Sequence, residues 1–280
     1  MRVAYLGPAG TFSEDALRQS GFVPAGPEGF SPMPVATLPA VVSSVSSGEA
    51  DRALVPVENS IEGSVRPTLD GLIEHADRVR IAGEYDHPVR SALISRSGHP
   101  LDAIEVVVSH PQPLAQCARF LAEALPEAEL RVASSTSAAV REVAETDRPW
   151  AALAPASAAA IYGCEILREG IEDEPGNVTR FLWLEPRDEL SSCHRASQET
   201  QGESGIWKTT LVFAELGADH PGALVDALLE FSSREINLVR IESRPLRREL
   251  GRYRFFIDIE GRESDPVVAE AISALRTKAE

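Results

Sequence analysis

Short apolar runs alternate with helix-like patterns from residue 2 to about residue 185, and this alternation limits the fold more than any other feature of the chain. Apolar runs of this length are typical of strands, and their alternation with helices is typical of parallel sheets covered by helices. Helices are expected from about Phe12 and from Pro111 or Gln112. The predicted strands lie at residues 2–6, 53–57, 103–109, 130–133, 150–154 and 178–184. We therefore predict two α/β lobes that face a cleft.

A polar stretch between about residues 185 and 205 separates this region from the rest of the chain. It has almost no apolar residues, which is typical of a linker or a mobile loop. Beyond it the pattern predicts strand, helix, strand, strand and helix, which is most of a ferredoxin-like unit. These elements are expected at residues 207–215, 221–233, 236–244, 252–260 and from about 265, with a hairpin at 247–251. We therefore predict domains at residues 1–187 and 206–280, joined by a linker at 188–205.

The charge balance and the cysteines exclude several classes of protein. With 43 acidic and 27 basic residues the formal net charge is −16, which disfavours binding to nucleic acid or to anionic membranes. No apolar run is long enough for a membrane span, and the N-terminus lacks the pattern of a signal peptide. The three cysteines, Cys117, Cys164 and Cys193, are odd in number and widely separated, which favours a reducing compartment and disfavours a zinc site. We expect a cytoplasmic protein without a metal.

Residues 7–13, Gly-Pro-Ala-Gly-Thr-Phe-Ser, lie where a strand is expected to end and a helix to begin. Glycines allow a close approach to the backbone, and free N–H groups at a helix start attract anions. Thr11 and Ser13 add hydroxyl donors. The segment is either an anion site or a tight turn with a hydroxyl cap, and both interpretations stay open on the residues alone.

Two further polar clusters follow predicted strands, which is where open α/β sheets place ligand groups, and a third lies at the edge of the predicted strand at 178–184. Glu58, Asn59 and Ser60 form the first, although Asn59 or Ser60 could equally cap a helix. The second begins at Ser109, where the following His110 is either a general base or a capping residue, since geometry decides a base. In the third, Arg180 beside Thr179 could pair with a carboxylate that the hydroxyl also reaches. Each cluster alone is a weak signal.

Together, in this order and spacing, these segments resemble the prephenate dehydratase family. The matching segments are residues 7–13, Val-Pro-Val-Glu-Asn-Ser at 55–60, Ser-His-Pro-Gln at 109–112 with Gln116 and Cys117, Ser-Thr-Ser-Ala-Ala at 135–139, and Asn-Val-Thr-Arg-Phe at 177–181. The C-terminal part resembles the ACT domain that usually follows. The resemblance covers nearly the whole chain. It implies a two-lobed, parallel or mixed-sheet α/β catalytic domain, periplasmic-binding-protein-like, and a ferredoxin-like α+β ACT domain.

The resemblance implies an enzyme that removes water and carbon dioxide from prephenate to give phenylpyruvate, with no cofactor. Thr179 would supply or relay the proton to the departing hydroxyl within a hydrogen-bond network, because a lone threonine is a very weak acid. Arg180 would hold one of the two carboxylates, and the motif does not decide which. The implied positioning residues are Glu58, Asn59, Ser109 and Gln116. The implied substrate-binding residues are Gly10, Thr11, Phe12, Ser13, Ser60 and Phe181.

The ACT resemblance implies a homodimer or homotetramer that binds phenylalanine as an allosteric ligand. The residues expected at that site are Gly222, Ala223, Leu224, Val225, Asn237, Leu238, Glu242, Ser243, Arg244 and Pro245. Without the resemblance, Gly222 is an ordinary helix-entry glycine and Arg244 a solvated charge at a sheet edge.

Two other functions remain open, and one element of the family pattern is missing. Arogenate dehydratase accepts an amino group where prephenate has a keto group, and a non-catalytic amino-acid sensor would use the same two-lobed fold. ACT domains usually end in a strand after the second helix, but Glu280 ends this sequence four residues after Arg276. We expect either that a final stretch is missing or that association protects the edge strand at 207–215.

Overall fold

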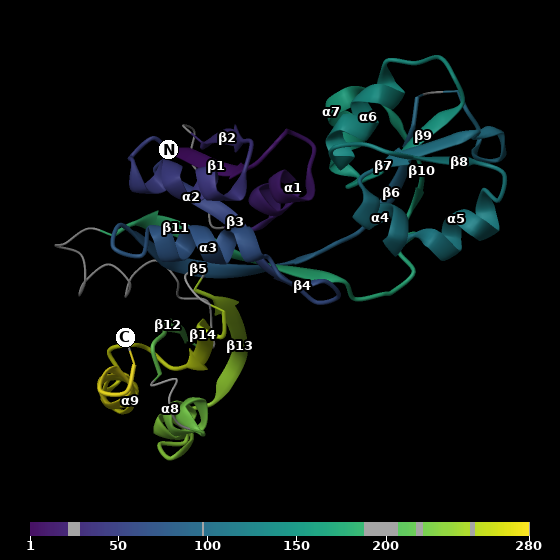
Figure 1. The fold of residues 1–280 in the computed structure, drawn as a ribbon. Helices are drawn as coiled ribbons and strands as arrows, with labels where there is room; N and C mark the ends of the chain where they lie inside the picture. Colours follow the sequence, from purple (N-terminus) through teal and green to yellow (C-terminus); the bar gives the residue numbers. More distant parts are fainter. Residues whose placement is uncertain (22–28, 97, 188–206, 217–220, 247–249, 280) are drawn as a thin grey trace. The chain divides into compact units, whose positions relative to one another are not determined.

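The structure, a computed structural model, describes residues 1–21, 29–96, 98–187, 207–216, 221–246 and 250–279. The chain divides into two compact units, Met1–His194 and Arg195–Glu280. Each unit is described below by itself (Figure 1). The predicted linker at 188–205 lies outside the described residues. Residues 247–249 of the predicted hairpin at 247–251 also lie outside them.

The first lobe of the first unit is built on a mixed sheet with strand order β2-β1-β3-β11-β5, in which β4 also pairs with β3. β1 runs parallel to β2 and to β3, whereas β11 runs antiparallel to β3 and to β5. The strands are β1 (Arg2–Leu6), β2 (Ser31–Val35), β3 (Arg52–Asn59), β4 (Gly63–Ser64), β5 (Val79–Pro88) and β11 (Val178–Pro186). The helices are α1 (Phe12–Gln19), α2 (Leu38–Ser46) and α3 (Arg66–Glu74).

The second lobe is built on a five-stranded sheet with order β10-β6-β9-β7-β8. The strands are β6 (Ala92–Ser95), β7 (Val106–Ser109), β8 (Glu129–Val132), β9 (Trp150–Ala154) and β10 (Glu165–Glu169). The helices are α4 (Pro111–Gln116), α5 (Ala118–Ala124), α6 (Thr136–Ala144) and α7 (Ser157–Tyr162), with a short 3-10 turn at Leu101–Ala103. β7 pairs in parallel with β8 and β9, and β6 is antiparallel to β9 and β10.

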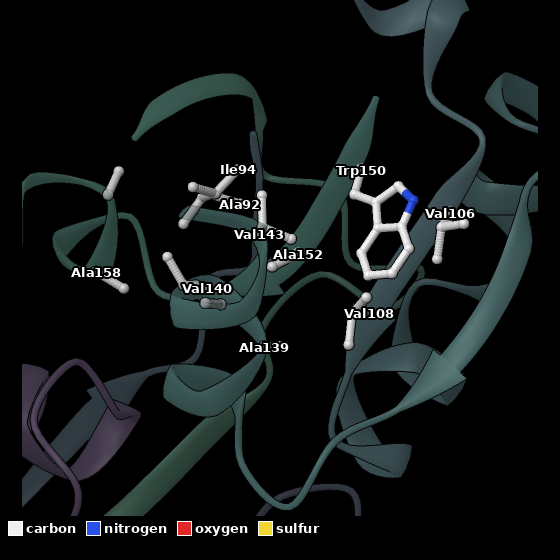
Figure 2. Close-up of a cluster of buried hydrophobic side chains, with 12 residues drawn as sticks. Ala92, Ile94, Val106, Val108, Ala139, Val140, Val143, Trp150, Ala152 and Ala158 are labelled. Carbon is white, nitrogen blue, oxygen red and sulfur yellow. The ribbon is translucent and has the colours of Figure 1, made fainter. Parts of the chain in front are cut away.

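The central strand β9 is buried on both faces, which explains its unbroken apolar sequence. Ala152 and Ala154 belong to a core with Ala139 and Val140 of α6, shown in Figure 2. The alternate residues of β9 belong instead to a core that includes Leu114 and Leu121 of α4 and α5. Helices therefore cover both faces of the sheet, as the strand–helix alternation predicts.

The chain passes between the two lobes after β5 and returns after β10 to form β11 in the first sheet. β11, the last strand of the first unit, thus lies between β3 and β5 in the sheet of the first lobe. The predicted two-lobed α/β architecture is confirmed, with mixed sheets.

The second unit is a three-stranded antiparallel sheet with order β12-β14-β13 and two helices. Its elements are β12 (Lys208–Phe213), α8 (Ala223–Ser232), β13 (Leu238–Pro245), β14 (Tyr253–Glu260) and α9 (Pro266–Arg276). Phe231 of α8 and Ile272 of α9 pack with Ile257 and Ile259 of β14 in one buried cluster. Asp265 is the N-cap of α9, but its carboxylate accepts from the Arg262 N–H at 2.7 Å instead of from the helix. The described residues after α9 contain no strand.

Candidate active site

Thr179, near the start of β11, lies between two residues from neighbouring strands. It is in register with Asn59 on β3 and with His87 on β5. Side chains directly opposite one another across a ladder lie on the same face of the sheet. Asn59, Thr179 and His87 therefore form a row on one face. The same face carries Phe181, two residues further along β11, which is buried under α1.

The side-chain amide of Asn59 connects the ends of β3 and β11. Its nitrogen lies 2.9 Å from Thr179 Oγ1, 2.7 Å from Asn177 Oδ1 and 3.3 Å from the Val178 carbonyl oxygen, and it donates to all three. Its oxygen accepts from the N–H groups of Ile61 and Glu62, both at 3.0 Å. These contacts determine the orientation of the amide. The Thr179 oxygen accepts a hydrogen bond, and its own O–H donates to no other described residue, so that proton is available to a substrate.

Gln116 reaches the same region from the second lobe. Its Oε1 accepts from Asn177 Nδ2 at 3.3 Å, and its backbone carbonyl accepts from the Asp173 N–H at 2.7 Å. Gln116 Nε2 is buried and has no hydrogen-bond partner among the residues that the structure describes. A buried amide N–H without a partner is costly, so this group is suited to donate to a bound ligand. Asn177 belongs to the Asn-Val-Thr-Arg-Phe motif, but the motif alone indicates no role for it.

Arg180 lies on the opposite face of the sheet from Thr179, because consecutive residues of a strand alternate between faces. Its Nε donates to Glu84 Oε2 at 2.7 Å, and its Nη1 lies 3.9 Å from Glu58 Oε2. Two of the predicted catalytic residues, Thr179 and Asn59, are therefore together, while Arg180 and Glu58 are together on the other side. Thr179 and Arg180 are neighbours in the sequence, as are Glu58 and Asn59, so the motifs alone do not show that these residues lie on opposite faces of the sheet.

In the glycine-rich segment at residues 7–13, the Gly10 N–H and the Thr11 hydroxyl already have partners within the protein. The Gly10 N–H donates to Glu14 Oε2 at 2.6 Å, and the Thr11 hydroxyl lies 3.2 Å from the Leu6 carbonyl and 3.0 Å from that of Pro8. Gly10 needs its glycine, because φ is +80° and a Cβ would lie 3.1 Å from the Tyr162 ring. The carboxylate of Glu14 thus occupies the place of an external anion. The geometry favours the tight-turn interpretation for Gly10 and Thr11; Phe12 and Ser13 begin α1, where Ser13 is buried.

Ser109 and His110 are engaged in the second lobe itself. The Ser109 side chain is fully buried and donates to the Leu153 carbonyl at 2.7 Å, which joins β7 to β9. His110 caps α4, and its Nδ1 accepts from the Gln112 N–H at 3.4 Å. The capping interpretation of His110 is therefore confirmed. Ser60 accepts from the Val178 N–H at 3.0 Å and helps to close the end of β11.

His87 and Asp15 form a buried pair that no sequence motif pointed to. His87 is 1% exposed, and its Nε2 lies 3.3 Å from Asp15 Oδ2 on α1. Its ring lies edge-on to Phe181, with centroids 6.1 Å apart. Burial raises the pKa of the Asp15 carboxyl, but the neighbouring His87 and Ser157 side chains outweigh it and hold that pKa below its ordinary value. Asp15 therefore stays ionised beside the imidazole.

The described residues offer little to other kinds of chemistry. They contain no group of three or more histidine, cysteine or acidic side chains arranged to hold a metal ion. No helix among them is both long and apolar enough to cross a membrane. Burial raises the pKa of the Cys117 thiol to about 12, so this cysteine is not a thiolate at neutral pH.

A family model described as prephenate dehydratase matches residues 3–189, which is more than half of the chain. The chain belongs to the prephenate dehydratase family. A second model, described as the ACT domain, matches residues 196–277.

Relatives of known name support this assignment over the full length. A prephenate dehydratase of Mycobacterium sp. (strain JLS) is 42% identical over 285 residues, which cover 100% of this chain and 86% of that protein. The solved structure of a prephenate dehydratase from Arthrobacter aurescens in complex with L-Phe is 38% identical, with a TM-score of 0.84 over 100% of this chain and 87% of that one. A structure described as a quorum quenching acylase, GqqA, is 30% identical, with a TM-score of 0.83 over 100% of this chain and 94% of that one.

In the ACT unit, the residues predicted to bind phenylalanine come from the start of α8 and from β13. Gly222 is the N-cap of α8 with φ of +97°, and the position of a Cβ there is open space. Val225 is 58% exposed, whereas Arg244 is only 8% exposed. The alternative view of Arg244 as a solvated edge charge is therefore wrong. Asn237 contributes its backbone carbonyl to the Glu260 N–H at 3.0 Å, just before β13.

Proposed function

We propose that this chain converts prephenate to phenylpyruvate and that phenylalanine regulates it through the ACT unit. Family membership and the full-length similarity to a protein named prephenate dehydratase support the activity. The observation that carries the chemistry is the hydrogen bond from Asn59 to Thr179 Oγ1, which leaves the hydroxyl proton of Thr179 free for the substrate.

In this reaction prephenate loses its ring hydroxyl as water and its ring carboxylate as carbon dioxide. Formation of the aromatic ring drives both losses, so the enzyme needs no strong nucleophile. It has to protonate the departing hydroxyl while keeping the departing carboxylate poorly solvated. A hydrogen bond donated to Thr179 Oγ1 withdraws electron density from that oxygen and makes its O–H a better donor.

The remaining residues divide into those that face the substrate and those that hold β11 in place. Gln116, with its unused buried N–H, would donate to a substrate oxygen. Arg180 lies on the opposite face of the sheet from Thr179, beside Glu84 and Glu58, and we therefore assign it, with Glu58, to fixing β11 against its neighbours. Phe181 packs beneath Thr179 and supports the same strand.

Regulation is proposed to use the open space beside Gly222 and the exposed start of α8. The relative from Arthrobacter aurescens was solved with L-Phe, which supports phenylalanine as the ligand of this chain as well. We further propose that the chain works in the cytoplasm as a homodimer or homotetramer.

The test is an assay of the purified chain for phenylpyruvate formed from prephenate, with arogenate in parallel, each with and without phenylalanine. We expect turnover of prephenate and inhibition by phenylalanine. Turnover of arogenate to phenylalanine in preference would reassign the substrate. Phenylalanine binding without turnover of either compound would make the chain an amino-acid sensor.

A further inference from the structure

The proposed reaction consumes a proton in every turnover. Prephenate carries two carboxylates and phenylpyruvate one, and the other products, carbon dioxide and water, are neutral. One proton must therefore enter from solvent for each substrate converted. If Thr179 gives its proton to the departing hydroxyl, its oxygen has to be reprotonated before the next turnover. A side chain that exchanges protons near neutral pH is suited to this task, and imidazole is the only common one.

His87 is the imidazole beside Thr179. The two residues are in register across β5 and β11, so their Cβ atoms lie within about 4.5–5.5 Å of one another. His87 Nε2 lies 3.3 Å from Asp15 Oδ2, and both ring nitrogens are buried without a hydrogen-bond partner among the residues the structure describes. Catalytic hydrogen bonds are often long in the absence of substrate and tighten when it binds. Asn59 approaches Thr179 from the other side at 2.9 Å. Thr179 thus has an amide donor on one side and an imidazole on the other.

Few charged groups near His87 could influence its protonation. From α1 it faces Asp15, and on the same helix Glu14 is paired with Arg18. On its own strand Tyr85 lies with ring centroids 5.9 Å away. The residues opposite on β11 and β3 are Thr179, Phe181 and Asn59, none of which ionises near neutral pH. Ser157 of α7 contacts Asp15 and is also neutral. Asp15 is therefore the charged group next to His87.

We propose that His87, held by Asp15, is a positioning residue that returns a proton to Thr179 in each turnover. This inference rests on the proposed function. The imidazolium N–H gives its proton to Thr179 Oγ as the Thr179 proton passes to the departing hydroxyl. The electron pair of the broken carbon–oxygen bond leaves with water, and the pair of the broken bond to the carboxylate enters the ring as carbon dioxide departs. Neutral His87 then takes a proton from solvent water, and Asp15 stays ionised throughout.

The test is the pH dependence of single-turnover phenylpyruvate formation, which excludes product release from the measured rate. The variants are His87→Asn, Asp15→Asn and, as a matched control, His75→Asn, which removes an imidazole at the end of α3. We expect the wild-type rate to fall as pH rises through the range where imidazole loses its proton. In His87→Asn the rate should fall by about 10- to 100-fold and lose this pH dependence, with KM within about threefold. In Asp15→Asn the fall should move to lower pH, and His75→Asn should behave as wild type.

Three results would overturn the proposal. The first is a wild-type rate that does not change with pH over this range, which decides the matter even if neither variant folds. The second is a His87→Asn enzyme with the wild-type rate and pH profile. The third is a loss of rate in His87→Asn with the wild-type pH profile retained there and in Asp15→Asn, which indicates a purely structural pair. A wild-type chain that converts neither prephenate nor arogenate refutes the proposed function itself, and this inference with it.

Discussion

At Thr179 a hydroxyl group that is a very weak acid in water accepts a hydrogen bond from the Asn59 amide. The same amide holds Asn177 and the Val178 carbonyl, and backbone N–H groups after β3 hold its oxygen. Together these contacts fix the orientation of the Asn59 amide toward Thr179. The site is therefore prepared before substrate arrives, which is the condition for efficient general-acid chemistry.

Replacing Asn59 by aspartate keeps the shape of the side chain but turns its donor into an acceptor. Thr179 Oγ1, Asn177 Oδ1 and the Val178 carbonyl would then face a carboxylate instead of an N–H group. We expect Asn59→Asp to lower kcat at least about 10-fold and the free energy of unfolding by about 2 kcal/mol. Steady-state kinetics and urea denaturation measure the two effects. Wild-type kcat in a destabilised variant would limit Asn59 to a structural role.

The sequence motifs were sufficient to place Thr179 and Asn59 in one candidate site, because both lie at the terminus of a strand: Asn59 at the end of β3 and Thr179 near the start of β11. They were not sufficient to separate Thr179 from Arg180, which lie on opposite faces, or to find the pair formed by His87 and Asp15. The latter depends on the register of β5 against β11, strands that are about 90 residues apart. Register between distant strands follows from packing over the whole sheet and leaves no local pattern.

Among the elements, the buried strands with the longest apolar runs were predictable, whereas most polar or edge strands were not. β9 and β7 are buried on both faces, and their runs of alanine, valine and leucine mark them clearly. β2 contains two prolines and β10 is a largely exposed edge strand, so neither resembles a core strand. β5 and β6 were missed as well. The antiparallel direction of β11 could not be predicted, since strand direction follows from the chain's return between the lobes.

The outer edge of β12 in the ACT unit pairs with no strand among the described residues. Unpaired backbone groups on an edge strand promote association with other chains. We expect a version with an added C-terminal strand after α9 to melt at a higher temperature, to scatter less light and to couple phenylalanine more strongly to turnover. Melting curves, light scattering and inhibition assays on the two lengths make the comparison. Equal results would mean that three strands are enough here.

At the start of α8, Gly222 offers a direct test of the phenylalanine site. Among the described residues, no atom lies within 4 Å of the position where its Cβ would be, so a valine there would project away from them. We expect Gly222→Val to abolish phenylalanine binding in calorimetry by filling space that the ligand needs. The matched control is Gly251→Val, which has the same open surroundings and positive φ and a similar backbone cost of about 1–2 kcal/mol. Normal phenylalanine affinity in Gly222→Val would mean that the site is elsewhere.

For the whole molecule, similarity of fold does not by itself decide activity. The relative described as a quorum quenching acylase has nearly the same TM-score as the prephenate dehydratase from Arthrobacter aurescens. Function depends on the residues of the site, and the residues that we propose for this site are Thr179, Asn59 and Gln116. A direct assay with prephenate is therefore the experiment that decides the activity of this chain.

Communication between the catalytic unit and the ACT unit has a thermodynamic consequence that can be measured. If phenylalanine lowers the affinity for prephenate, prephenate must lower the affinity for phenylalanine by the same factor. We expect calorimetric titration of phenylalanine in the Thr179→Val variant, which would bind prephenate without consuming it, to give a higher Kd when prephenate is present. An unchanged Kd would show that phenylalanine acts on turnover without changing substrate affinity.

If Thr179 protonates the departing hydroxyl, the enzyme should lose most of its activity when this hydroxyl is removed. The decisive measurement is kcat of the Thr179→Val variant with prephenate. Valine keeps the branching and nearly the same shape but has no proton to donate and no oxygen for Asn59. We expect kcat to fall by about 100-fold or more while KM and the folded structure are largely kept. A purified, folded Thr179→Val enzyme with near-normal kcat would contradict this role of Thr179.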